Sequence, residues 1–303
     1  MLRLCAPAKL NLFLHITGRR TDGYHDLQTV FQLLDFGDEL QFTRTLTAEV
    51  TLACNKPELA TPDNLVLRAA ALLQPYNSGK WGCAIQLNKH LPAGGGLGGG
   101  SSDAATTLVA LNGLWRCDLE QSALTALART LGADVPVFIA GYSAWAEGTG
   151  EKLQILPLPE RWYVVLTPNC KSLTQQIFSH LELTRNSAPI RIPAFPFSGT
   201  RNDCQAVASL LHPQIQQALD WLTEKAEKTT GNKAGSSAWA DSQARMTGTG
   251  SSVFSCFANQ AQATEVLAQL PATFSGFVAR GVNQSPLYQD FAQKLEQALV
   301  EQS

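Results

Sequence analysis

The chain has 303 residues, of which 45% are apolar and 16% charged, and this length and composition suit a compact globular protein of about two domains. Its 23 basic and 25 acidic residues give a formal net charge of −2, so no overall positive field would attract nucleic acid or an anionic membrane. No stretch of sequence predicts a membrane span. We therefore expect neither a nucleic-acid nor a membrane partner.

The cysteines indicate a reducing environment. All seven are scattered singly, without the close Cys and His spacing of a zinc or redox site. The first residues faintly resemble a signal peptide, but Lys9, Asn11 and His15 interrupt the apolar region that such a peptide requires. The sequence therefore predicts a cytoplasmic protein with reduced thiols.

The N-terminal segment predicts a strand followed by an exposed turn and an apolar stretch. Apolar alternation from Leu10 to Leu14 predicts a half-buried strand with Lys9 and Asn11 on one face. Residues 18–25 predict an exposed turn, and a mostly apolar stretch follows over residues 27–34. Polar residues of the turn could meet a ligand.

Helical and strand patterns alternate in the next segment. Residues 64–73 have helical composition, and alternation over residues 83–87 predicts a strand that Pro92 closes. Beyond a glycine-rich loop, apolar residues recur at helical spacing over residues 108–115, and Asp118 could cap a helix over residues 119–131. This alternation predicts an α/β first domain.

A second domain is predicted to begin after residue 155. Proline content rises there, and the apolar run at residues 163–166 predicts the opening strand of the second domain. We therefore predict one domain over residues 1–155 and another over residues 156–303.

The second half of the chain also contains a polar segment. Residues 223–244 are poor in aliphatic side chains and predict a flexible surface insertion. Ordinary helices are expected over residues 261–270 and 286–299.

The loop Pro92 to Ser102 gives the strongest functional signal. It lies between a predicted strand and a predicted helix, where consecutive backbone N–H groups and the helix dipole can converge on phosphate oxygens. Glycines from Gly94 to Gly100 remove the side chains that would block this approach. A flexible glycine linker is the alternative interpretation, but regular structure is predicted on both sides of the run. The loop therefore predicts phosphate binding.

Three other nucleotide-binding motifs fit this sequence less well. A P-loop is excluded because no lysine follows the last glycine of the run. Gly94, Gly96 and Gly99 satisfy the dinucleotide pattern, but Asp118 stands where a helix begins and not where a second strand would end. The triplet at residues 35–37 matches the protein-kinase Asp-Phe-Gly, yet it precedes the glycine loop and no His-Arg-Asp loop exists.

Three motifs together resemble those of the GHMP kinases. They are residues 7–12, the glycine loop with residues 103–105, and residues 247–252, in that order across most of the chain. Within this superfamily, residues 20–25 and 131–138 look like the 4-diphosphocytidyl-2-C-methyl-D-erythritol kinase family of the non-mevalonate isoprenoid pathway. The 223–244 segment is longer than expected for that family.

The resemblance implies a fold and a reaction. The fold is a two-domain α/β (α+β) structure, with an N-terminal ATP-binding domain, a ferredoxin-like C-terminal domain and the active site in the cleft between them. The reaction is ATP-dependent phosphorylation of the 2-hydroxyl of a cytidine-diphosphate-linked methylerythritol, with Mg²⁺ offsetting the phosphate charge. The chain would act on this small molecule as a monomer or homodimer.

The resemblance also implies roles for individual residues. Asp134 would accept the hydroxyl proton, and Lys9 would hold Asp134 ionised and stabilise developing negative charge. Tyr24, His25 and Phe178 match the family's cytosine pocket, and Asn11 shares the face of Lys9. ATP binding falls on Pro92, Ala93, Gly94, Gly95, Gly96, Leu97, Gly98, Gly99, Gly100, Ser101 and Ser102.

Each of these residues also has a structural interpretation. Asp134 could cap a helix that contains Pro136, and Ser101 and Ser102 could cap the helix after the glycine loop instead of touching phosphate or magnesium. Lys9 could be a solvated strand lysine and Phe178 ordinary core. His25 could be a solvated turn histidine, Asn11 a strand-edge amide, and residues 247–252 a tight turn before a strand.

Two alternative functions stay open. One is a kinase acting on homoserine or a mevalonate derivative, which would not need the aromatic residues Tyr24, His25 and Phe178. The other is a nucleotide-binding protein without turnover, against which the pair of Lys9 and Asp134 argues.

Overall fold

The computed structural model describes residues 1–192, 197, 199–231 and 243–301, and the structural statements below refer to these residues. Its strands form one sheet in the order β3-β4-β2-β10-β7-β9-β8, with β1 added on β2 and the β5-β6 pair also on β2. The strands are β1 (Leu2–Arg19), β2 (His25–Thr45), β3 (Val50–Cys54), β4 (Gly82–Asn88), β5 (Ala144–Gly148), β6 (Lys152–Ile155), β7 (Trp162–Pro168), β8 (Arg245–Met246), β9 (Val253–Phe257) and β10 (Phe274–Val282).

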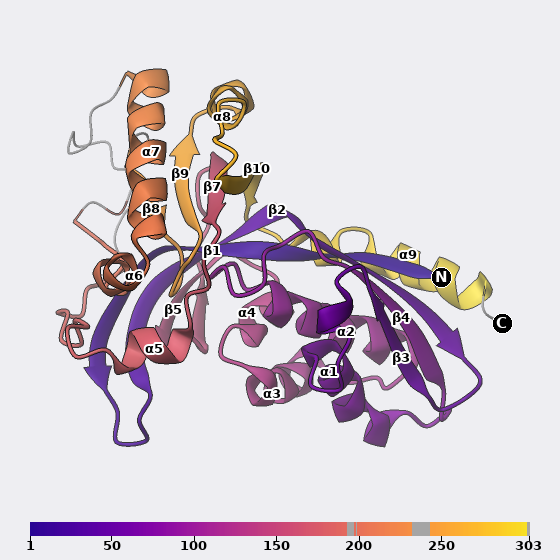
Figure 1. Ribbon diagram of the computed structural model, residues 1–303. Helices are drawn as coiled ribbons and strands as arrows, with labels where there is room; N and C mark the ends of the chain where they lie inside the picture. The colour runs from indigo at the N-terminus through magenta and orange to yellow at the C-terminus, as the bar shows by residue number, and fades with distance from the viewer. Residues whose placement is uncertain (193–196, 198, 232–242, 302–303) are drawn as a thin grey trace.

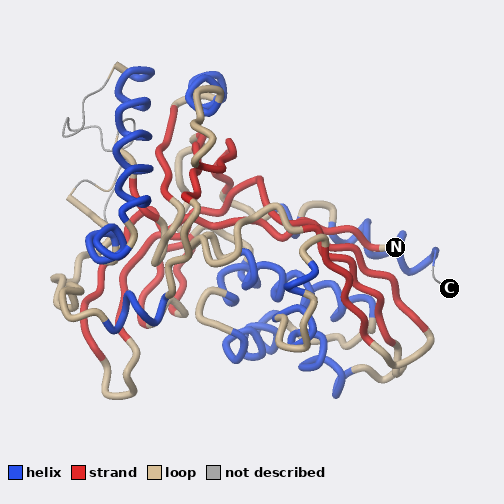
Figure 2. The backbone as a smooth tube through the Cα atoms, viewed as in Figure 1, coloured by secondary structure: helices blue, strands red, loops and turns tan. Residues whose placement is uncertain are grey.

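Helices cover this sheet along its length (Figures 1 and 2). Short 3₁₀ turns occur at Pro57–Leu59, Gln74–Tyr76 and Pro286–Tyr288. The α-helices are α1 (Leu65–Leu73), α2 (Gly99–Leu114), α3 (Gln121–Leu131), α4 (Val135–Ala140), α5 (Thr174–Ser179), α6 (Gln205–Leu211), α7 (Pro213–Thr230), α8 (Gln260–Leu267) and α9 (Phe291–Glu301).

Strands β1 and β2 are long because apolar side chains continue along both. They pair antiparallel from Leu2 opposite Phe42 to Arg19 opposite His25, and residues 20–24 form the turn predicted between them. The ladder shifts register between Pro7 and Lys9 and again a few residues later. Such register shifts change the direction in which the side chains of a strand point, and these two shifts lie on either side of the segment that carries Lys9.

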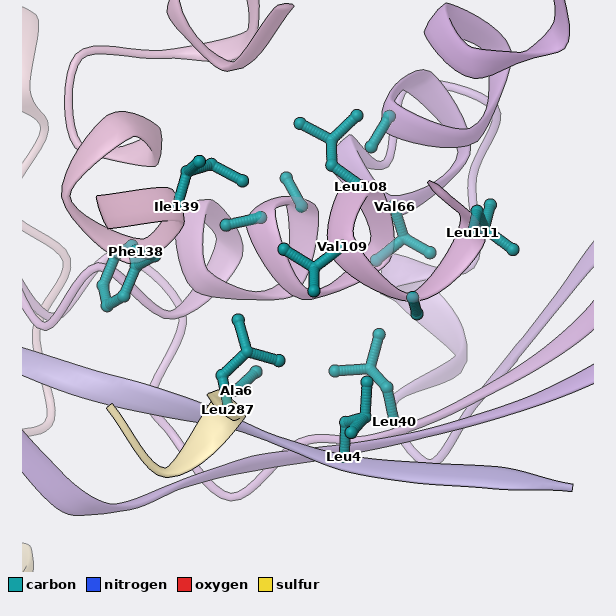
Figure 3. Packing of buried hydrophobic residues seen from close by; sticks show 14 of the residues in the cluster. Leu4, Ala6, Leu40, Val66, Leu108, Val109, Leu111, Phe138, Ile139 and Leu287 are labelled. Atoms are coloured by element: carbon teal, nitrogen blue, oxygen red, sulfur yellow. The ribbon is translucent and has the colours of Figure 1, made fainter. Parts of the chain in front are cut away.

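The first core lies between the sheet and helices α1 to α4. Helix α2 is buried on nearly every side, because it runs beneath the sheet and is surrounded by α1, α3 and α4. Figure 3 shows strand side chains meeting helix side chains in this core. The labelled residues are Leu4, Ala6, Leu40, Val66, Leu108, Val109, Leu111, Phe138, Ile139 and Leu287.

The second core is built on strands β7 to β10. Their order is β8-β9-β7-β10 with every neighbouring pair antiparallel, and α7 and α8 connect them in a βαββαβ sequence. This arrangement is the ferredoxin-like one, as expected. The two-domain α+β fold class is thereby confirmed.

The packing adds detail to the predicted division at residue 155. Strand β6 ends at Ile155 and β7 begins at Trp162, but the chain returns to the first core after β10. Leu287 and Ala298 belong to that core, and α9 lies along the β1 side of the sheet, away from the second core (Figure 1). A third cluster, which includes Leu12, Leu97 and Tyr163, joins the two halves.

Two local expectations differ from the structure. The polar segment expected from residue 223 begins as helix, because α7 continues to Thr230 and buries Ala226; residues 232–242 lie outside the described residues. Asp118 does not cap α3, since that helix begins at Gln121 and the backbone of Asp118 has a left-handed φ of 53°.

Within the described ranges, no helix combines the length and the apolarity that crossing a bilayer requires.

Candidate active site

One cavity of about 730 Å³ brings together most of the residues predicted to be functional. Its volume lies in the range typical of small-molecule sites. Segments from both halves of the chain line it, including the β1-β2 turn, α5 and the residues 248–250 before β9. The predicted site residues in its wall are Lys9, Asn11, Tyr24, His25, Gly94, Gly96, Ser101, Asp134 and Phe178.

Lys9 and Asp134 form an ion pair in the wall of this cavity. Lys9 Nζ lies 3.2 Å from Asp134 Oδ2, and the Lys9 side chain is 3% exposed whereas that of Asp134 is 36% exposed. Lys9 Nζ also donates to Asn11 Oδ1 and, at 3.2 Å, to the carbonyl oxygen of Gly96. Lys9 is therefore a buried, fully engaged cation and not a solvated strand lysine.

Asp134 occupies the N-cap position of α4 without acting as a cap. Its side chain accepts no hydrogen bond from the first turn of the helix, although Pro136 stands just inside the start as expected. The carboxylate instead faces Lys9 and the cavity. An acid and a cation thus share one cavity wall.

The glycine loop has the backbone conformation of an anion-binding concavity. Gly94, Gly96 and Gly98 have φ values of +73°, +76° and +73°, alternating with residues in other conformations. The backbone N–H groups of Gly94, Gly96, Leu97 and Gly98 donate no hydrogen bond to another described residue. These donors lie at the start of α2, where the helix dipole adds positive potential.

Carbonyl groups of the same loop are held by the protein. The Gly96 oxygen accepts hydrogen bonds from Lys9 Nζ and Thr247 Oγ1, each at 3.2 Å, and the Gly95 oxygen accepts one from the Ser252 N–H at 3.1 Å. A Cβ on Gly96 would lie 2.2 Å from the Thr247 oxygen, so the two segments approach as closely as backbones can. The 247–252 turn therefore holds the glycine loop in place through the loop's carbonyl groups.

The remaining loop residues have different surroundings. Leu97 is buried in the cluster that joins the two halves, and Ser102 is fully buried with no hydrogen-bond partner for its Oγ among the described residues. Ser102, Pro92, Ala93, Gly95 and the glycines from Gly98 to Gly100 do not line the cavity.

We expect Gly98→Ala to weaken ATP binding by about tenfold or more. A Cβ there would lie 2.9 Å from the Phe138 ring and 3.1 Å from Lys9 Cγ, at a φ that L-residues rarely adopt. A shift of about 1.4 kcal/mol corresponds to tenfold in affinity. Calorimetric titration with a non-hydrolysable ATP analogue measures the effect. Gly231→Ala is the control, since the φ of Gly231 is also +73° but a Cβ there would have no atom within 4 Å. Equal losses of affinity in both variants would contradict the prediction.

A buried charge cluster lies directly beneath the loop. Lys89 Nζ donates to Asp103 Oδ2 at 2.7 Å and to Asp38 Oδ2, and the three side chains are at most 5% exposed. Asp38 comes from β2 and Asp103 from the first turns of α2, and a Cβ on Gly99 would lie 3.2 Å from Lys89 Nζ. The cluster therefore ties the sheet to the start of the phosphate-loop helix.

This cluster contains two acidic groups and one basic group. The pKa of Asp103 is raised to about 7, mainly by burial, with Lys89 opposing the rise and Asp38 adding to it. Asp103 Oδ1 has no hydrogen-bond partner among the described residues. Asp103 is thus the group of this cluster that keeps a proton in the folded protein at pH values below about 7.

We expect Asp103→Asn to change how stability depends on pH. Between about pH 4, where an ordinary aspartate titrates, and pH 7, folded wild type keeps a proton that the unfolded chain has released. The stabilising contribution of Asp103 is therefore complete below this window and is lost as pH rises through it. Because asparagine does not titrate, the free energy of unfolding of the variant minus that of wild type should grow from pH 4 to 7. Urea unfolding across this range measures the difference, and a constant difference would contradict the assignment.

Part of the cavity wall is aromatic. Tyr24, which is 64% exposed, follows a turn in which Asp22 accepts hydrogen bonds from the Tyr24 N–H and the Arg20 side chain. His25 opens β2, and its ring stacks on Phe178 of α5 with centroids 5.0 Å apart. We call these three residues, Tyr24, His25 and Phe178, the aromatic end. Phe178 is therefore not simply core, and His25 is not a solvated turn residue.

Several residues of the site carried no sequence signal. Thr29 accepts a hydrogen bond from Asn11 Nδ2 at 3.0 Å, and Thr149 and Gly150 reach the cavity from the end of β5. Arg185, in the loop after α5, donates to His25. None lies in a recognisable motif, and only the fold brings them to the cavity.

The comparisons with known proteins agree with the motifs. The family model described as GHMP kinases N terminal domain matches residues 64–142. A 4-diphosphocytidyl-2-C-methyl-D-erythritol kinase of Shewanella frigidimarina is 48% identical and covers 93% of this chain and 92% of its own length. One from Pseudomonas putida strain F1 is 47% identical over 100% of this chain and 98% of its own.

Solved structures extend the likeness to the fold. A crystal structure of 4-(cytidine 5'-diphospho)-2C-methyl-D-erythritol kinase has a TM-score of 0.78 and 30% identity, covering 93% of this chain and 100% of its own. A mevalonate kinase structure has a TM-score of 0.63 at 15% identity, a likeness that concerns the fold alone. With close to half of its residues identical over nearly the whole length of named relatives, this chain belongs to the 4-diphosphocytidyl-2-C-methyl-D-erythritol kinase family.

Proposed function

We propose that the protein transfers the γ-phosphoryl group of ATP to the 2-hydroxyl of 4-diphosphocytidyl-2-C-methyl-D-erythritol, giving the 2-phosphate and ADP. The observation that supports this most strongly is the single cavity that joins the glycine loop, the Lys9–Asp134 pair and the aromatic end. The family membership supports the same substrate.

The reaction follows from the position of each group. The hydroxyl oxygen attacks the γ-phosphorus, the bond from that phosphorus to the β,γ-bridging oxygen breaks, and the hydroxyl proton passes to Asp134. Lys9, held by Asn11 and the Gly96 carbonyl, pairs with the Asp134 carboxylate at 3.2 Å and stabilises negative charge as it develops. Loop N–H groups without a protein partner bind the phosphates of ATP.

The site fits a magnesium ion that is coordinated mainly by the phosphates of the nucleotide. The described residues contain no group of three or more His, Cys, Asp or Glu that could hold a metal by themselves. Ser101 and Asp134 supply oxygen donors in the cavity, and Mg²⁺ usually takes one or two protein oxygens together with substrate phosphates and water. When bound, the ion offsets the charge of the phosphates.

The aromatic end would hold the cytosine. Exposed Tyr24 offers a face for stacking on a base, and the side chains of His25 and Phe178 close the opposite side. We further propose a cytoplasmic protein that acts as a monomer or homodimer without nucleic acid. Its near-neutral charge supports a function without nucleic acid, and the free cysteines of the described residues support the cytoplasmic location.

Acceptor-dependent ADP release tests the proposal. The purified protein is supplied with Mg²⁺-ATP and, in separate reactions, the cytidyl compound, homoserine or mevalonate. We expect turnover with the cytidyl compound alone and a product whose phosphorus spectrum shows a new phosphomonoester. Turnover with homoserine or mevalonate would overturn the substrate assignment, and ATP binding without turnover in any reaction would support a silent nucleotide-binding protein.

A further inference from the structure

Arg185 connects the two walls of the aromatic end. Its Nε donates to His25 Nε2 at 3.3 Å, and its Nη2 donates to the carbonyl oxygens of Phe178 at 2.9 Å and His180 at 2.7 Å. Its Nη1 donates to the Leu183 carbonyl at 3.1 Å. The guanidinium therefore fixes the last turn of α5 against the first residue of β2.

These contacts determine which nitrogen of His25 carries the proton. A guanidinium only donates hydrogen bonds and stays protonated at any physiological pH, so His25 Nε2 must present a lone pair to Arg185. In a neutral imidazole the proton then resides on Nδ1. Protonation of both nitrogens would set two N–H groups and two positive charges against each other.

The surroundings of His25 favour the neutral ring. The pKa of His25 is lowered, first by burial and then by the positive charges of Arg185 and Arg19. No described residue forms a hydrogen bond with Nδ1, and His25 lines the cavity. The Nδ1–H group is thus the ring donor that His25 can offer to a bound molecule.

We infer that Arg185 is a positioning residue that holds His25 as the Nδ1–H tautomer and thereby makes the aromatic end select cytosine over uracil. The inference rests on the proposed function and deepens it. Cytosine presents an unprotonated N3 acceptor at the centre of its pairing edge, where uracil presents an N3–H donor, and both bases carry an O2 acceptor. A fixed donor directed at N3 therefore pairs with cytosine and opposes uracil, and an opposed polar pair in a binding site costs far more than a lost methyl group.

Nitrogen NMR of the full chain labelled with ¹⁵N-histidine tests the tautomer directly. The protein has five histidines, and His25→Gln assigns the His25 signals by their disappearance. We expect wild type to show a protonated Nδ1 and a lone pair on Nε2, and Arg185→Met to show a mixture of tautomers and cation. A wild-type His25 protonated on Nε2 would overturn the inference, whether or not the variant folds.

Kinetics of the same variants test the consequence. We expect Arg185→Met to raise KM for the cytidyl substrate about tenfold, with kcat and KM for ATP within about threefold of wild type. The ratio of kcat/KM for the cytidine-linked over the uridine-linked substrate should also fall by about tenfold. Arg185→Lys, which keeps the charge and one donor, should recover part of both. Arg191→Met, at an exposed arginine of the same loop, is the control and should match wild type.

Failure of the inference is distinguishable from failure of the proposed function. If wild type does not phosphorylate the cytidyl compound, the proposed function fails while the tautomer measurement still stands. If wild type is active but Arg185→Met keeps the wild-type tautomer or the wild-type base preference, Arg185 is only a structural link between α5 and β2.

Discussion

Replacing Asp134 with asparagine should lower kcat by about 10²- to 10⁴-fold while the affinity for ATP stays within about threefold of wild type. This range is the usual contribution of a positioned acid or base to a proton transfer. Asp134 is the carboxylate paired with Lys9 in the cavity wall, and its side chain caps no helix. Its removal should therefore leave α4 and the glycine loop in place. Single-turnover phosphoryl transfer and ATP-analogue binding measure the two quantities separately.

A matched variant distinguishes a specific effect at Asp134 from a general effect of replacing an aspartate. Asp220 on α7 is an exposed aspartate outside the cavity, so Asp220→Asn should have wild-type turnover and stability. Asp134→Ala should behave like Asp134→Asn, because both remove the proton acceptor. Near-normal turnover in either Asp134 variant would refute the assignment of Asp134 as the proton acceptor.

Replacing Lys89 with methionine should destabilise the protein by about 3–5 kcal/mol. Removing one partner of a buried ion pair leaves a buried charge uncompensated, and here two carboxylates, Asp38 and Asp103, would face each other. The methionine fills similar volume, so the loss reflects charge and not a cavity. Urea unfolding followed by circular dichroism measures the change, and lowering the pH below 7 should reduce it because Asp103 becomes protonated.

A second substitution makes this prediction sharper. Combining Lys89→Met with Asp103→Asn removes one of the two carboxylates that would face each other. The loss of unfolding free energy in this double variant should therefore be clearly smaller than the sum of the losses in the two single variants. Lys228→Met on α7 is the control, since both Lys228 and its partner Glu224 are exposed and solvent screens such a pair, so that its loss should leave stability almost unchanged. Additive free energies in the double variant would show that the three groups do not interact.

The sequence predicted the elements of the fold well where periodicity was strong. Alternation at residues 83–87 marked β4, and the apolar runs at residues 27–34 and 163–166 lie within β2 and β7. Strand lengths were underestimated, since β1 continues from Leu2 to Arg19 with both faces buried and so shows little alternation beyond its middle. The end of α7 was also missed, because its last turns are polar and only Ala226 is buried there.

The site was predictable only as far as its motifs extend. Lys9, Asp134 and the glycine loop lie in motifs, and the structure brings them to one cavity. Burial of Lys9 was not predicted, because its partners Asn11, Gly96 and Asp134 are distributed over three separate segments. Arg185 is an ordinary loop arginine in sequence, and only the packing of α5 against β2 reveals its link to His25.

The return of the chain to the first core has a consequence for biosynthesis. Leu287 and Ala298 complete a core whose other members come almost entirely from residues 2–146, and β10 pairs with β2 at Gly281 and Val282. Translation proceeds from the N-terminus, so the half that carries the glycine loop is made first and yet cannot close until nearly all of the chain has left the ribosome. The nucleotide-binding half, although made first, therefore matures only when the chain is nearly complete.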